Sequence, residues 1–154
     1  MIDSDLYGIF FQLVLATFLG AIIGIEREVK GKAAGFRTYA LVALGACLFT
    51  VISIYGFNPA LSQGFDPSRI ASQVVVGIGF IGAGLIFVRG GTVQGLTTAA
   101  GIWTSAAVGM GVGVRMYSIS IFAAFLAVFV LRVMRWFEPY FHKDDGEDQK
   151  HAAQ

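Results

Sequence analysis

Charged side chains of both signs lie directly beside long apolar stretches in this chain, and they are the residues best suited to chemistry. The first group comprises Glu26, Arg27 and Glu28, and it is followed by Arg37 and Thr38. If the apolar stretches span a membrane, charges at their edge are costly unless they pair or serve a site. Consecutive residues on a helix point in different directions. We therefore expect at least one of Glu26 and Arg27 to turn inward.

A second group of the same kind, with Arg89, Thr97 and Thr98, follows a later apolar stretch. Thr38 and Thr98 are expected near helix N-termini, where a hydroxyl can cap free backbone N–H groups and where partial positive charge favours an anion. Glu26 or Glu28 could supply that anion. The set is either an internal network of ion pairs and caps, which we favour, or a site for a ligand or partner; its members are Glu26, Arg27, Glu28, Arg37, Thr38, Arg89, Thr97 and Thr98.

Enzymatic chemistry finds little support in the sequence. The two histidines, His142 and His151, lie in a polar tail, and there is no Gly-x-Ser-x-Gly motif. We therefore expect neither catalysis nor a cofactor. Nucleic-acid binding is not expected either, because no basic patch is interleaved with exposed aromatic residues.

The sequence leaves a metal site undecided. Mg²⁺ prefers octahedral oxygen ligands and retains several waters, and only Glu26, Glu28 and backbone carbonyls are available to meet it. No Asp or Glu lies inside a predicted span. This weakens the case for a cation transporter but leaves it open, since a site can be built from carbonyls and helix ends.

The elements that position these residues follow from composition. The chain is 56% hydrophobic and 14% charged, with a mean hydropathy of +0.71, which predicts an all-α integral membrane protein. Five apolar stretches approach or reach the roughly 20 residues that a helix needs to cross the hydrocarbon core. They predict a transmembrane domain over residues 1–137, with spans at about 6–25, 38–57, 70–88, 96–114 and 116–134, and a disordered acidic cytoplasmic tail at 138–154.

The distribution of Lys and Arg predicts the orientation. With the N-terminus outside and the C-terminus inside, nine of the 11 fall on the cytoplasmic side, and only Arg69 and Arg115 stay outside. The first helix is expected to remain as a span. Asp3 and Asp5 occupy the N-terminus, where a signal peptide would be basic.

The first and second pairs of spans repeat one pattern. A Gly-Ala pair precedes an arginine by the same distance in both, from Gly20 to Arg27 and from Gly82 to Arg89, and a Gly-x-x-Thr sequence follows each arginine. Both copies run from outside to inside and back. The pattern therefore predicts parallel repeats related by an axis along the membrane normal.

Glycine predicts where helices pack closely. Eleven of the 20 lie between Gly77 and Gly113, and small residues let helices approach in lipid. We expect the third and fourth spans, with the first, to form the packed centre and the fifth, which carries several Phe residues, to face lipid. Small-residue faces also favour a homodimer. The glycines expected to pack are Gly20, Gly24, Gly77, Gly79, Gly82, Gly84 and Gly101; Gln73 and Ser105 are expected either to bond a neighbouring helix or to line a polar pathway.

The chain resembles the MgtC/SapB family of membrane proteins. The resemblance rests on four segments that together span most of residues 6–131: Gly20-Ala-Ile-Ile-Gly24-Ile-Glu26-Arg27-Glu28, Ala34-Gly35-Phe36-Arg37-Thr38, Gln73-Val-Val-Val-Gly77-Ile-Gly79-Phe-Ile-Gly82-Ala-Gly84 and Gly95-Leu-Thr97-Thr98-Ala-Ala-Gly-Ile-Trp103. Longer family members continue into a cytoplasmic domain with an ACT-like fold, which is not expected here after the short acidic tail.

The resemblance implies a five-helix, multi-pass protein of the bacterial inner membrane that supports growth under magnesium limitation, with a virulence role in some members. In one branch it implies restraint of the proton-translocating ATP synthase. The leading hypothesis is a non-enzymatic membrane protein that acts by binding a membrane partner or copies of itself. The alternative is a transporter or channel for Mg²⁺ or another small solute.

Overall fold

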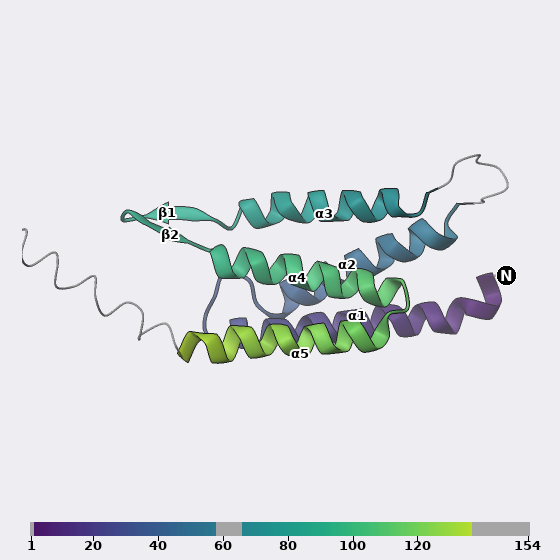
Figure 1. Cartoon of the computed structure of the whole chain (residues 1–154), viewed down its shortest axis with the longest axis horizontal. Coiled ribbons are helices and arrows are strands. Elements are labelled where there is room, and N and C mark those ends of the chain that lie inside the picture. Colours follow the sequence, from purple (N-terminus) through teal and green to yellow (C-terminus); the bar gives the residue numbers. More distant parts are fainter. Residues whose placement is uncertain (1, 58–65, 137–154) are drawn as a thin grey trace, which may run out of the picture.

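The structure is a computed structural model that describes residues 2–57 and 66–136 (Figure 1). Within these residues the helices are α1 (Ile2–Val29), α2 (Phe36–Tyr55), α3 (Ser68–Ala83), α4 (Leu96–Gly113) and α5 (Tyr117–Val133), which a short 3-10 helix (Met134–Trp136) continues. A hairpin of β1 (Phe87–Arg89) and β2 (Thr92–Gln94) joins α3 to α4. The predicted tail at 138–154 lies outside the described residues.

Each of the five predicted apolar stretches forms a helix. Two of these helices are long and apolar enough to cross a membrane, at Asp5–Val29 and Phe36–Tyr55. The apolar helices α3 and α5 are shorter, with 16 and 17 residues. The described part of the chain is thus mainly helical and contains two candidate membrane spans.

The third predicted span is wrong at its C-terminal end. We expected a helix through residue 88, but α3 ends at Ala83 and the chain enters β1. Gly90 and Gly91 have φ values of 60° and 79° and lie between the paired residues Arg89 and Thr92. Two consecutive positive φ values suit the tight hairpin turns that glycine favours. The flanking β-branched and aromatic residues favour strands, so a hairpin follows α3.

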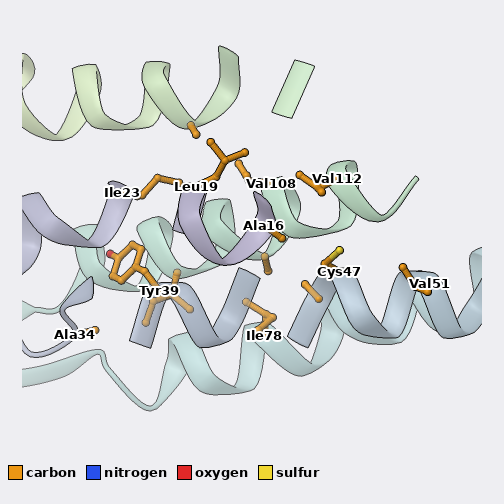
Figure 2. Packing of buried hydrophobic residues seen from close by; sticks show 14 residues of the cluster. Ala16, Leu19, Ile23, Ala34, Tyr39, Cys47, Val51, Ile78, Val108 and Val112 are labelled. Atoms are coloured by element: carbon orange, nitrogen blue, oxygen red, sulfur yellow. The ribbon is translucent and has the colours of Figure 1, made fainter. Parts of the chain in front are cut away.

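The packed centre consists of α1, α2 and α4, which corrects the prediction that it would consist of the first, third and fourth spans. Ile23 of α1, Tyr39 of α2 and Ile102 of α4 are fully buried, and Figure 2 shows Ile23 and Tyr39 within this cluster. By contrast, α3 buries only Ile78 and Gly82 among its residues. It lies at the outside of the bundle (Figure 1).

Glycines on α1 and α4 face α2 at very short range. A Cβ added at Gly20 would lie 2.7 Å from the Cβ of Ala43, and one at Gly24 would lie 2.9 Å from the Cβ of Tyr39. A Cβ at Gly101 would overlap the Tyr39 hydroxyl. Glycine at these positions is what lets the three helices approach one another.

The glycines of α3 differ from those of α1 and α4. A Cβ at Gly82 would make an ordinary contact with Ala99, at 3.6 Å, and one at Gly84 would meet carbonyl oxygens of its own helix end. Added Cβ atoms at Gly77 and Gly79 would find nothing within 4 Å. Gly77 and Gly79 thus depart from the prediction of packing, because the described part of the chain places no helix against them.

Two polar contacts join α1 to the C-terminal end of α4 and to Arg115, which follows it. The buried Gln12 amide donates from Nε2 to the carbonyl oxygens of Val112 and Gly113, both at 2.9 Å, and so links α1 to the C-terminus of α4. Arg115 lies 3.0 Å from the Asp5 carboxylate. Hydrogen bonding between the Arg115 guanidinium and the Asp5 carboxylate is the main cause that raises the pKa of Arg115.

Candidate functional site

Glu26 and Arg27 are buried at the C-terminal end of α1, with residue exposures of 7% and 5%. The Arg27 guanidinium reaches across to α4, where Nη2 donates to the Thr98 hydroxyl at 2.8 Å. A charged residue at this depth must be paired or hydrogen-bonded. We call Glu26, Arg27, Lys30, Tyr39 and Thr98 the polar cluster.

The Glu26 carboxylate lies between two cations. Its Oε2 is 3.7 Å from Nη1 of Arg27, and its Oε1 is 3.0 Å from Nζ of Lys30, one helical turn further on. The contact with Lys30 is an ion pair between residues four positions apart. Both carboxylate oxygens of Glu26 are buried, and neither has a hydrogen-bond partner within the described part of the chain. Nε of Arg27 lacks one there as well. The cluster therefore contains three buried polar atoms able to bond water or a ligand atom.

Tyr39 connects the polar cluster to the helix core. Its hydroxyl donates to the backbone carbonyl of Thr98 at 3.3 Å, and its own carbonyl accepts a hydrogen bond from Ser105 Oγ at 2.9 Å. The face of α4 that carries Thr98, Gly101 and Ser105 is therefore a helix-helix contact with α2. Of the two roles predicted for Ser105, the structure places it in the first, a bond to a neighbouring helix.

Thr38 and Thr98 lie in the first turns of α2 and α4, as predicted, but neither hydroxyl caps its helix. The N-cap residues are Gly35 for α2 and Gly95 for α4, and neither helix has a side-chain cap. Both threonines lie three residues inside the cap position, where a hydroxyl no longer reaches the first free N–H groups. Thr98 instead accepts a hydrogen bond from Arg27.

The structure divides the predicted site residues into two sets. Glu26, Arg27 and Thr98 come together in the polar cluster. The remainder are exposed: Glu28, Arg37, Thr38, Arg89 and Thr97. Gln73 is also exposed and lies on α3, away from this cluster.

Sequence reasoning missed Lys30 and Tyr39 as members of the cluster. Lys30 could have been found, because it follows Glu26 by four residues, which is the spacing of ion pairs on one helix face. The sequence carries no comparable signal for Tyr39. Its role depends on the approach of α2 to α4, which only the tertiary structure shows.

The charges determine what the cluster can hold. Glu26 supplies one negative charge, and Arg27 and Lys30 each supply one positive charge, so the net charge of these three side chains is positive. This environment suits water or an anionic atom better than a divalent cation, which would be repelled by both neighbours. Within residues 2–57 and 66–136, no three His, Cys, Asp or Glu residues are grouped as a metal site requires.

Comparison with known proteins gives a consistent result. The sequence model of the MgtC family matches residues 13–140. The chain is 50% identical over 125 residues to "Putative magnesium transporter YhiD" of Escherichia coli K12, covering 79% of this chain and 58% of that protein. It is 44% identical over 124 residues to "Protein MgtC" of Brucella abortus, covering 80% of this chain and 49% of that protein.

A third relative is "Protein SapB" of Bacillus subtilis, which is 36% identical over 152 residues, covering 96% of this chain and 62% of that protein. The chain thus spans about half to three-fifths of the length of these curated relatives. No solved structure matches it.

Proposed function

The chain belongs to the MgtC family, and on this premise we propose that it is a non-enzymatic protein of the bacterial inner membrane that supports growth under magnesium limitation. It acts by binding a protein partner within the membrane. By family resemblance, one such partner is the proton-translocating ATP synthase.

We propose that all five helices span the bilayer, with the N-terminus outside and the C-terminus in the cytoplasm. Support comes from the two candidate spans and from the predominance of Lys and Arg on one side. In this topology the polar cluster and the hairpin face the cytoplasm. Gly35 and Gly95 are N-caps followed three residues later by Thr38 and Thr98, which supports α1–α2 and α3–α4 as parallel repeats.

The observation that carries the proposed role is the ion pairing of Glu26. Its carboxylate has Arg27 and Lys30 as neighbours, while Arg27 also holds α4 through Thr98. A buried carboxylate used in this way fixes the relative positions of helices and is a poor ligand for Mg²⁺. The exposed side chains of Arg37 on α2 and Arg89 on β1 then belong to the surface that a partner would contact.

Growth of a strain that lacks the chromosomal copy tests this proposal. The chain carrying Arg37→Gln should reach normal levels in the membrane and yet fail to restore growth at limiting magnesium, because the exposed guanidinium is lost without disturbing the core. Lys32→Gln, at another exposed position of the α1–α2 connection, is the matched control. Full restoration by both variants would refute a partner surface that includes Arg37.

Transport of Mg²⁺ or another small solute is the second candidate. It is favoured by the name of the Escherichia coli relative and by the buried carboxylate oxygens of Glu26, which accept no hydrogen bond within the described part of the chain. Flux into proteoliposomes decides between the two, with Mg²⁺, other ions and protons measured separately. A specific flux that is lost in Glu26→Gln establishes transport, whereas restored growth without any such flux supports the binding role.

A further inference from the structure

A groove with a volume of about 650 Å³ separates α2 from α3 along most of their length. Its walls are almost entirely apolar. From α2 they comprise Thr38, Leu41, Val42, Gly45, Ala46 and Phe49, and the part of the α3 wall used below comprises Gln73, Gly77 and Ile81. The α3 residues follow one another at intervals of four, so they share one face of the helix.

Both walls of this groove contain a glycine that has open space beside it in the described part of the chain. A Cβ added at Gly45 or at Gly77 would find no atom within 4 Å. The helix that forms the outer wall is itself poorly covered, because only Ile78 and Gly82 of α3 are buried. The groove is therefore open. Its outer wall, α3, lies at the outside of the bundle (Figure 1), and its glycines leave room for a close helix contact.

Gln73 is the polar residue of the α3 wall. Its amide is exposed and forms no hydrogen bond within the described part of the chain. An amide has both donors and an acceptor, and in a membrane interior it requires a partner that can match both. A lipid acyl chain would fill the groove but leave the amide unpaired.

We propose that the α2–α3 groove receives α3 of a second copy of this chain, in a two-fold dimer that places the Gln73 side chains of the two copies against each other. A two-fold axis brings identical surfaces together, so each residue on the axis meets itself. The amide is one of the few side chains that can hydrogen-bond to its own kind, donating through Nε2 and accepting through Oε1. Gly77, one turn away on the same face, allows the two α3 helices to approach. This inference depends on α3 lying in the membrane and not on the proposed partner.

Disulfide cross-linking of the full chain in phospholipid vesicles tests the geometry. In a Cys47→Ala background, Gln73→Cys should form a disulfide-linked dimer on mild oxidation. Ser72→Cys is the matched control, because Ser72 is also exposed and lies at nearly the same depth but about 100° around the helix. The expected result is a several-fold higher yield of dimer for Gln73→Cys. Equal yields at the two positions, or none at Gln73, would overturn the proposal.

Mass measurements on the full chain in lipid nanodiscs test the packing independently. Gly77→Leu fills the groove and should shift the protein from dimer to monomer, whereas Gly79→Leu, at a glycine that is equally open but does not line the groove, should leave the dimer intact. Gln73→Leu should weaken dimerisation about fivefold, which corresponds to the roughly 1 kcal/mol of an interhelical polar contact in membranes. A monomeric wild-type chain that retains bound lipid would identify an acyl chain as the occupant and refute the dimer.

Discussion

Arg27 on α1 donates a hydrogen bond to the hydroxyl of Thr98 on α4, across 71 positions of sequence and over 2.8 Å. Both side chains are buried, and the same guanidinium lies beside Glu26. The bond therefore does two things. It joins the first and fourth helices, and it orients the cation that partly neutralises a buried carboxylate.

Replacing the hydroxyl alone measures the first of these effects. Thr98→Val keeps the shape of the side chain but leaves Arg27 without its acceptor, so we expect a loss of about 1 to 2 kcal/mol in the free energy of unfolding. Thr97→Val changes the adjacent, exposed threonine and should stay within about 0.5 kcal/mol of wild type. Unfolding in mixed micelles measures both. Similar values for the two variants would show that the Arg27 bond contributes nothing.

Removing the cation measures the second effect. Arg27→Met preserves much of the side-chain volume but leaves Glu26 buried with only Lys30 as a partner, so the expected loss is about 3 kcal/mol. The double variant Glu26→Gln with Arg27→Met should be more stable than Arg27→Met alone, because it no longer buries a poorly compensated charge. A double variant that is as unstable as the sum of the two single changes would contradict this coupling.

The N-terminus of α3 should respond to acid. The Asp66 carboxylate accepts a hydrogen bond from the Ser68 backbone N–H at 2.9 Å, and hydrogen bonding by Ser68 is the main cause that lowers the pKa of Asp66 below its ordinary value of 3.8. A depressed carboxyl pKa in the folded state stabilises the fold above the unfolded-state pKa, and this contribution is lost as the pH falls through the folded-state value. The first turn of α3 should therefore lose protection only below about pH 4.

Hydrogen exchange at the amides of α3 provides the measurement. In the wild-type chain, exchange corrected for its intrinsic pH dependence should accelerate in the first turn on acidification, while the middle of the helix stays protected. Asp66→Ala should show the faster exchange already at neutral pH. An Asp66→Ala chain that retains the pH response of wild type would assign the effect to another group.

The sequence was a good guide to helices and to one buried pair, and a poor guide to what lies inside the bundle. Long apolar stretches predict helices well, and the cost of charge in a membrane correctly predicted that at least one of Glu26 and Arg27 turns inward. The structure buries both. Apolarity does not separate a buried face from a lipid-facing one, because lipid is as apolar as the core. The third stretch was assigned to the packed centre because of its many glycines, although Gly77 and Gly79 face open space.

The contrast between glycines supplies the last prediction. A Cβ at Gly109 would overlap the backbone carbonyl of Ala43 and lie 2.9 Å from its Cα. Backbone atoms in a helix cannot move aside independently, so Gly109→Ala should force α4 away from α2 and cost about 1 to 3 kcal/mol. Gly79→Ala meets no atom within 4 Å and gains the higher helix propensity of alanine, which favours α3 by up to about 1 kcal/mol. The free energy of unfolding, measured in mixed micelles, should thus fall for Gly109→Ala and rise for Gly79→Ala, although the chemical change is the same. If both variants are destabilised equally, Gly79 is covered by another helix, and the assignment of α1, α2 and α4 as the packed centre would need revision.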